Sequence, residues 1–284
     1  MRALVMSGGG VKGAFQLGVL KHWMHDLQRD YEIVCGVSVG AINAACVSMV
    51  PFGKPKEAWE TLNGLWARCD NSKIRKSWPI FGLAAALWKT SGFDSTPLQK
   101  WIHAELDVPK IKASGRKVRV GAVCWEDGEY KFGTEQDDKL ADWVLASSSF
   151  PGMFAPVLLE GKLWTDGGVK NVTPLGEAIR LGATEIDVIL CDNPELASTW
   201  SPKNKAVLPG YAVRAIDLMG TAVIMADLKI CGLKNDLAAL DERYKHVKIN
   251  LMMPQVKLCE DPLDFDPVKI KGMIEVGYKQ ASLV

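Results

Sequence analysis

Two short apolar runs near the N-terminus constrain the fold most, because each of them ends in a glycine-containing turn. Residues 2–6 lead into Ser7–Gly13, and residues 33–35 lead into Gly36–Gly40. A helical pattern follows each turn, over 12–27 after the first and 41–50 after the second. Buried strand, turn and helix, repeated in this order, favour an α/β fold with a mostly parallel central sheet flanked by helices.

The rest of the chain continues this alternation and adds two hairpins, one around Asp127-Gly128 and one around Gly161. The polar segment 193–209 contains three prolines and is expected to be a loop. No repeat or linker divides the chain, so we expect a single domain over 1–284. Further helices are expected at 55–68, 95–106, 138–148, 174–181, 211–230 and 268–281, and further strands at 118–125, 129–132, 157–159, 163–164, 185–191 and 245–251.

Composition excludes several classes of protein. Hydrophobic residues make up 48% of the 284 residues and charged residues 24%, which is incompatible with intrinsic disorder. The net charge of +1 argues against a general nucleic-acid-binding protein, since these depend on a basic surface. The seven cysteines include no C-x-x-C pair, which favours buried free thiols in a reducing cytosol over disulfides or a zinc site. We expect neither a metal nor a cofactor.

The distribution of apolar residues predicts a soluble, cytoplasmic protein. An uninterrupted run of only four apolar residues precedes Ser7, fewer than the roughly 7–15 that a secretory signal needs. The longest apolar run, Trp78–Trp88, has eleven residues, and a membrane span needs about 20.

The strongest local signal is Gly36-Val37-Ser38-Val39-Gly40, a G-x-S-x-G pattern between a strand and a helix. In this context the pattern is typical of a nucleophile elbow, which exposes the serine hydroxyl above the edge of a sheet. The glycines Gly36 and Gly40 allow such a turn to close. The alternative is an ordinary small-residue turn, because glycine and serine are common.

The first turn, Gly8–Gly13, has three possible interpretations. Its spacing fits the dinucleotide-binding pattern G-x-G-x-x-G, which would indicate a redox enzyme. That pattern requires an acidic residue at the end of the second strand, whereas Asp30 and Glu32 precede this strand. Alternatively, consecutive glycines provide backbone N–H groups for an oxyanion hole. The third interpretation is a purely structural turn.

A nucleophilic serine needs a base. Asp166 opens an Asp-Gly-Gly turn formed with Gly167 and Gly168, and such turns are common without any catalytic role. His246 follows Asp166 in the chain, so that Ser38, Asp166 and His246 have the order of an α/β-hydrolase triad. His246 also fits an exposed position at the edge of a strand. The residues alone therefore leave the identity of the base open.

Taken together, these motifs resemble those of the patatin-like phospholipases. Residues 7–13 are similar to the glycine-rich D-G-G-G-x-R/K-G block of that family, and 36–40 match its nucleophile motif. Residues 146–156 resemble its A-S-x-x-x-P-x-x-F-x-P block, and 166–174 resemble its D-G-G/A block with the trailing N-x-P. A weaker family segment is similar to 92–98. The resemblance extends over about residues 1–250 and implies a three-layer patatin-like fold.

The resemblance also implies a Ser38–Asp166 dyad that hydrolyses phospholipid or lysophospholipid esters. The N–H groups of Gly8, Gly9 and Gly10 would hold the oxyanion, and no metal or cofactor is needed. Ser7 replaces the usual Asp, and Lys12, before Gly13, replaces the usual Arg, which keeps the charge but loses the bidentate geometry. Alternatives are a generic carboxylesterase with the His246 triad and a catalytically silent lipid-binding protein.

A possible lipid-contacting segment is the apolar run Trp78–Trp88, flanked by Lys73, Arg75, Lys76 and Lys89. Tryptophan near positive charge suits the boundary of a lipid bilayer, so peripheral membrane contact is one interpretation. The other is a helix buried within an inserted cap at about 70–92.

Overall fold

The computed structural model describes residues 1–77, 91–193, 195–196, 208–238 and 246–283. Of 208–217, Asp227 and Lys234 it describes the backbone alone. The apolar segment Trp78–Trp88 lies outside the described residues, as does most of the expected loop at 193–209.

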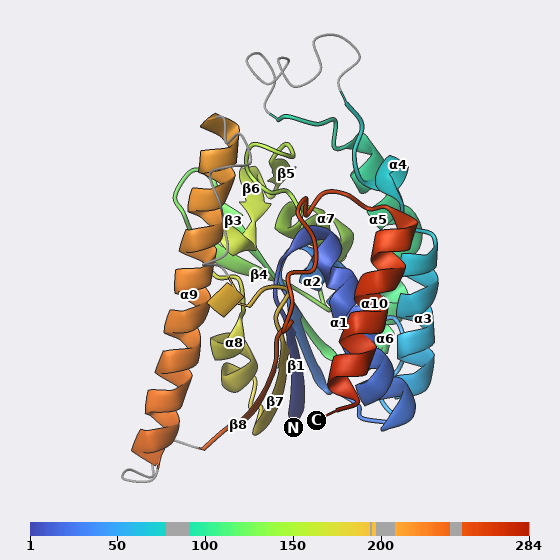
Figure 1. The fold of residues 1–284 in the computed structure, drawn as a ribbon, viewed down its shortest axis with the longest axis vertical. Helices are drawn as coiled ribbons and strands as arrows, with labels where there is room; N and C mark the ends of the chain where they lie inside the picture. The colour runs from blue at the N-terminus through green and yellow to red at the C-terminus, as the bar shows by residue number, and fades with distance from the viewer. Residues whose placement is uncertain (78–90, 194, 197–207, 239–245, 284) are drawn as a thin grey trace.

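A single sheet of eight strands forms the centre of the described part of the chain (Figure 1). Strands β3, β2, β1, β7 and β8 are parallel and adjacent in that order, whereas β4, β5 and β6 are antiparallel additions around β3. Their bounds are β1 Arg2–Met6, β2 Ile33–Gly36, β3 Lys117–Cys124, β4 Tyr130–Thr134, β5 Val157–Leu159, β6 Lys162–Asp166, β7 Glu185–Ile189 and β8 Lys248–Met252.

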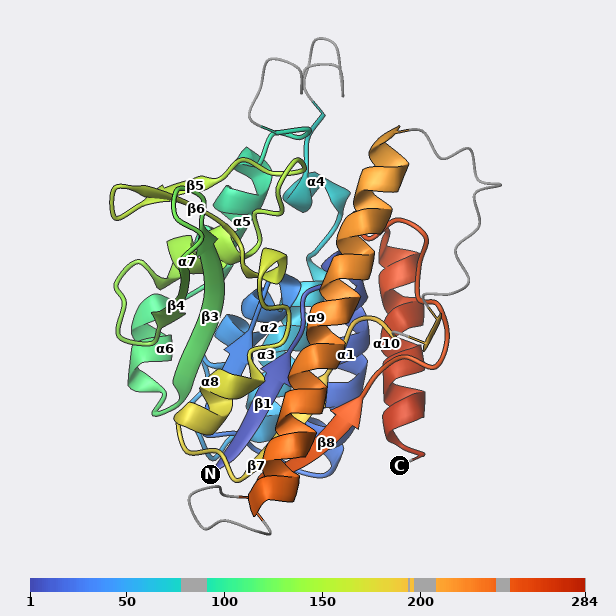
Figure 2. The same ribbon diagram turned by 90° about the vertical axis from the view of Figure 1, so that its left-hand side faces the viewer.

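Helices cover both faces of this sheet (Figures 1 and 2). On β1, Leu4 and Met6 join the core that includes α1, α2 and α10, while Ala3 and Val5 join the core under α8 and α9. The helices are α1 Gly13–Leu20, α2 Val39–Val47, α3 Pro55–Ala67, α4 Asn71–Ile74, α5 Thr96–Glu105, α6 Val108–Ala113, α7 Leu140–Ser147, α8 Leu175–Arg180, α9 Leu208–Ala238 and α10 Pro267–Ala281. The predicted three-layer α/β architecture is therefore confirmed.

The antiparallel strand β6 occupies a position that β2 leaves free. Val120 of β3 pairs with Gly36 of β2 on one side and with Gly133 of β4 on the other. Two residues further along β3, Ala122 pairs with β4 on one side and with Asp166 of β6 on the other. Because β4 pairs with the other edge of β3 over this range, β6 must pair with the same edge as β2, beyond the point where β2 ends. The C-terminal ends of β2 and β6 therefore meet.

Most of the predicted elements are present, and the differences have simple physical reasons. Helices α4 and α6 were not predicted, because helices of four and six residues are too short to show a periodicity. The expected helix 12–27 consists of a 3₁₀ turn, α1 and a π-helical turn at Lys21–Asp26. Helix α9, with 31 residues, is longer than expected at both ends.

The cysteines and the long helices bear on two further predictions. Six of the seven cysteines are buried and Cys259 is partly buried. Burial raises the pKa of the Cys69 and Cys191 thiols to about 12, so these groups stay protonated at neutral pH. No described helix combines the length and the apolar character required to span a membrane.

Candidate active site

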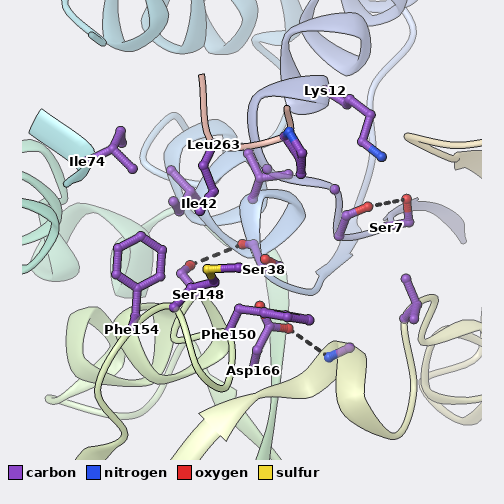
Figure 3. Close-up of a pocket in the computed structure, with 18 of the residues that line it drawn as sticks. Ser7, Lys12, Ser38, Ile42, Ile74, Ser148, Phe150, Phe154, Asp166 and Leu263 are labelled. Atoms are coloured by element: carbon purple, nitrogen blue, oxygen red, sulfur yellow. Dashed lines mark hydrogen bonds between the residues drawn. The ribbon is translucent and has the colours of Figure 1, made fainter. Parts of the chain in front are cut away.

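Ser38 lies in a strained turn between β2 and α2. Its backbone has φ 57° and ψ −128°, a left-handed conformation that costs energy for any residue except glycine. The turn directs the hydroxyl into a cavity at the carboxyl ends of the parallel strands (Figure 3). Helix α2 begins at the next residue, so its positive N-terminal end lies close to any negative charge that develops on a group bound to Ser38.

Two glycines allow this turn to be so tight. A Cβ on Gly36 would lie 2.1 Å from the carbonyl oxygen of Gly40, and a Cβ on Gly40 would lie 2.3 Å from that of Met6. Neither backbone contact leaves space for a side chain. This is the physical reason why a G-x-S-x-G pattern is found at this turn.

Two serines at the C-terminal end of α7, Ser147 and Ser148, hold the backbone of Ser38 in place. The Ser147 hydroxyl accepts a hydrogen bond from the Ser38 N–H at 3.0 Å, and the Ser148 hydroxyl donates to the Ser38 carbonyl at 3.3 Å. The carbonyl oxygen of the next residue, Ser149, accepts hydrogen bonds from the Asp166 N–H at 3.1 Å and the Thr165 hydroxyl at 2.6 Å. One short segment thus contacts both Ser38 and the end of β6.

Asp166 ends β6 and is buried at the wall of the same cavity. Its Oδ1 accepts a hydrogen bond from the Gly168 N–H at 2.8 Å, whereas Oδ2 is buried without a hydrogen-bond partner among the described residues. Burial raises the pKa of Asp166 to about 7, although the nearby Ser38 hydroxyl and the Gly168 N–H oppose this rise. The two side chains make no hydrogen bond of ordinary geometry in the resting structure. A carboxyl group with this pKa can accept a proton near neutral pH.

The glycine-rich turn after β1 forms another wall of the cavity. Gly9 has φ 155° and Gly10 has φ 60°, and a Cβ on either would clash, with Cys191 Cβ at 2.3 Å or the Pro262 carbonyl oxygen at 2.2 Å. Among the described residues, none accepts a hydrogen bond from the N–H of Gly8, Gly9 or Gly10. Gly13 opens α1 just beyond them. Backbone donors beside a serine hydroxyl can stabilise an oxyanion.

Lys12 points away from the serine, toward the end of β7. Its ammonium group is paired with the Asp192 carboxylate, and both residues line the cavity. Although burial opposes it, this carboxylate raises the pKa of Lys12, which keeps the lysine charged. The strand order changes direction between β1 and β7, and the crevice at such a point is where open α/β sheets bind ligands.

The cavity beyond Ser38 is mainly apolar, and residues from distant parts of the chain line it. One side is formed by side chains of α3, α4 and α5 together with the segment before α10. The other side includes three residues of α9. The main lining residues are Trp66, Ile74, Leu98, Trp101, Phe265, Gly220, Thr221 and Ile224. An apolar cleft with a few polar groups at its centre suits a ligand with hydrocarbon chains.

The structure separates His246 from Ser38. His246 precedes β8 and lies at the amino end of this parallel strand, whereas Ser38 follows the carboxyl end of β2. His246 is exposed, and no histidine is found among the described residues that line the cavity. His103 contacts Asp142 on the surface instead, at 3.0 Å. His246 and Ser38 therefore lie at opposite ends of the parallel strands, whereas Asp166 lies at the same end as Ser38.

Comparison with known proteins identifies the family. The family model described as patatin-like phospholipase matches residues 4–179, so the chain belongs to this family, as its motifs predicted. This range contains Ser38, Asp166 and the glycine-rich turn.

Individual relatives are distant from this chain. A protein from Escherichia coli described as uncharacterized protein YjjU is 27% identical over 188 residues, which are 66% of this chain and 51% of that protein. Lysophospholipase nte1 from Aspergillus terreus is 24% identical over 60% of this chain and 10% of its own length. The chain thus spans about half of the first relative and a tenth of the second. Among solved structures, VipD from Legionella pneumophila has a TM-score of 0.48 at 13% identity, covering 99% of this chain and 66% of VipD.

The structure brings together the residues that the sequence singled out. Ser38, Asp166, Gly168 and the turn Gly8–Gly10 all line one cavity, and Gly167 follows Asp166 in a 3₁₀ turn. Sequence reasoning missed the part of Ser147 in holding the backbone of Ser38. The run of three serines before Phe150 was visible within a family block, but no pattern shows which hydroxyl contacts Ser38.

Proposed function

We propose that this protein is a lipid acyl hydrolase that cleaves carboxylic esters of phospholipids or lysophospholipids. Membership of the patatin-like phospholipase family supports lipid hydrolysis in general. The name of the Aspergillus relative points to lysophospholipids, and the apolar cavity suits an acyl chain. In this proposal Ser38 is the nucleophile and Asp166 the base.

The reaction begins when the Asp166 carboxylate accepts the proton of the Ser38 hydroxyl. The serine oxygen attacks the ester carbonyl carbon, and the carbonyl oxygen gains a negative charge. The N–H groups of Gly8, Gly9 and Gly10 stabilise this charge together with the N-terminal end of α2. As the C–O bond to the alcohol breaks, Asp166 returns the proton to the leaving oxygen.

Deacylation repeats these steps with water. Asp166 accepts a proton from a water molecule, the hydroxide attacks the acyl-serine, and the proton returns to Ser38 as the fatty acid leaves. A pKa of about 7 suits a group that must accept and release a proton in each half of the cycle.

The observation that carries this proposal is the meeting of β2 and β6 on the same edge of β3. It places the strained serine next to a buried carboxylate whose Oδ2 has no hydrogen-bond partner among the described residues. A buried unpaired carboxylate oxygen is costly, and its position beside a nucleophile gives it a chemical use.

The test is the release of fatty acid from phosphatidylcholine vesicles and from lysophosphatidylcholine micelles, with a short-chain p-nitrophenyl ester as a soluble substrate. We expect hydrolysis by the wild type and none by Ser38→Ala, with circular dichroism showing that the variant is folded. Release of fatty acid by Ser38→Ala at the wild-type rate would refute the proposal. An inactive wild type that still binds the vesicles would make the protein a lipid-binding protein.

A further inference from the structure

The outer face of α9 carries a row of exposed apolar side chains. Met219 is 65% exposed, Ile230 50%, Leu233 54% and Leu237 42%. The opposite face of α9 packs on the sheet through Ile224 and Cys231, among others. The ribbon shows α9 at the outside of its layer, with no labelled helix beyond it (Figures 1 and 2). Contiguous exposed apolar groups of this kind mark an interaction site.

The spacing of these residues is that of a helix-pairing seam. Met219, Val223, Ala226, Ile230, Leu233 and Leu237 follow one another at intervals of four, three, four, three and four. This is the seven-residue repeat with two apolar positions, which keeps a partner helix in continuous contact. At 1.5 Å per residue the seam is about 27 Å long. We call these six residues the outer seam of α9.

Charges beside the outer seam are arranged for an antiparallel partner of the same sequence. Lys229 directly precedes Ile230, and Asp236 follows Leu233 by three positions. If two copies of α9 pack antiparallel with Ile230 of one beside Leu233 of the other, Lys229 of each copy faces Asp236 of the second. Two-fold symmetry then forms the ion pair twice. A parallel arrangement does not bring Lys229 and Asp236 together, because they occupy equivalent flanking positions one heptad apart.

These observations favour a protein partner over a lipid surface. Lys229 and Asp236 neutralise each other along the outer seam, whereas helices that lie on anionic membranes gather lysine and arginine. We propose that the outer seam of α9 pairs with the same seam of a second copy of this chain, forming an antiparallel two-fold dimer.

Such a dimer would also affect the cavity beside Ser38. Gly220, Thr221 and Ile224 on the inner side of α9 line that cavity. A second copy packed on the outer seam fixes the position of α9 from outside. The wall of the cavity is therefore held more firmly in the dimer than in the monomer.

The experiment measures the mass of the full chain in solution by light scattering coupled to size exclusion, over a series of protein concentrations. We expect the wild type to change from 31.1 kDa to twice that mass as concentration rises. Ile230→Glu and Leu233→Glu should each keep the protein monomeric. The matched control is Met225→Glu, because Met225 is 50% exposed on the same helix but lies outside the outer seam. Circular dichroism and melting curves verify that each variant folds.

Charge exchange tests the antiparallel register. Lys229→Glu and Asp236→Lys should each weaken the homodimer by about tenfold, because each creates two like-charge contacts. An equimolar mixture of the two variants should dimerise as well as the wild type, since both ion pairs form again in the mixed dimer. Recovery in the mixture is not expected from any role of these residues within one chain.

Three results would overturn this proposal, none of which depends on enzymatic activity. The first is a wild type that stays monomeric at every concentration. The second is an equal loss of dimer in Met225→Glu and Ile230→Glu. The third is flotation of the wild type with phosphatidylcholine vesicles that is lost in Ile230→Glu while the mass in solution is unchanged, which would assign the outer seam to lipid.

Discussion

The turns after β1 and β2 are neighbours with the same local topology, yet they present different chemical groups to the cavity. After β2, the backbone N–H of Ser38 is bonded to Ser147, and the side chain is the group left exposed. After β1, Gly8, Gly9 and Gly10 have no side chains, and their N–H groups have no acceptor among the described residues. The comparison teaches that one strand–turn–helix unit can present a side-chain hydroxyl or backbone N–H donors to a cavity, according to which backbone groups its neighbours satisfy.

Removing the carboxylate beside Ser38 tests the second turn most severely. We expect Asp166→Asn to lower kcat on the soluble ester by about 10²–10⁴-fold, because the amide cannot accept the serine proton. The variant should keep its fold, since the amide oxygen can still accept the Gly168 N–H. Steady-state kinetics with circular dichroism provide the measurement. Wild-type activity in Asp166→Asn would mean that Asp166 is not the base for the Ser38 hydroxyl.

The pH dependence of activity and stability also tests the role proposed for Asp166. Its carboxyl group has a pKa raised from 3.8 to about 7 in the folded protein, so kcat/KM should fall as pH drops below about 7. A raised pKa means that the folded state holds this proton more tightly, so its stabilising contribution is complete below pH 4 and is lost as pH rises to about 7. Relative to the wild type, Asp166→Asn should therefore gain roughly 4 kcal/mol of stability across this range. Urea denaturation at pH 4.5 and pH 8 measures the free energy of unfolding of both proteins. If the difference between the two proteins is the same at both pH values, the result contradicts the burial of the charge.

Adding a methyl group to the first turn separates its role in packing from its proposed role in binding the oxyanion. In Gly9→Ala the new Cβ meets Cys191, so we expect loss of stability and a fall in kcat of about 10²–10³-fold, the usual value of one oxyanion donor. In Gly8→Ala the new Cβ would lie 3.0 Å from Ser38 Cβ at an unstrained backbone position. Gly8→Ala should therefore lower kcat while changing the melting temperature much less. Equal melting temperatures for the two variants would show that the clash at Gly9 is absent.

Ser147→Ala tests the support of the second turn. The variant leaves the Ser38 N–H without its acceptor, which should free the strained backbone and lower kcat by about tenfold, the value of one hydrogen bond. Ser149→Ala is a suitable control, because the Ser149 hydroxyl donates to the Leu145 carbonyl and does not contact Ser38. A loss of similar size in the control would indicate a general effect on the segment after α7.

The smallest expected effect is that of His246→Ala, which should leave kcat within about twofold of the wild type because His246 lies at the opposite end of the parallel strands from both turns. The measurement is the rate of p-nitrophenyl ester hydrolysis at pH 8. A loss of the size predicted for Asp166→Asn would restore the triad.

The two turns also show what sequence can predict and where it stops. Both strand–turn–helix units are readable from residues 2–13 and 33–40, because apolar runs and glycines act locally. The choice between Asp166 and His246 was not readable, because it depends on which edge of β3 receives β6 and on the direction of β8. Those pairings join residues at least 40 positions apart along the chain, for which no local pattern exists. The hydrogen bond from Ser38 to Ser147 escaped prediction for the same reason, since its partners are 109 positions apart in the chain.

The division of the cavity between two parts of the chain has a consequence for substrate choice. The family match ends at residue 179 and includes Ser38 and Asp166, while Gly220, Thr221, Ile224, Leu263 and Phe265 come from beyond it. Ser38 and Asp166 therefore lie within the family match, whereas the apolar lining comes from both sides of residue 179, with Trp66 and Trp101 before it. Exchanging the segment after residue 179 for that of a relative would change one wall of the cavity while leaving Ser38 and Asp166 in place. Under the proposed function this should change which lipid is accepted, so the C-terminal third is one place to engineer selectivity.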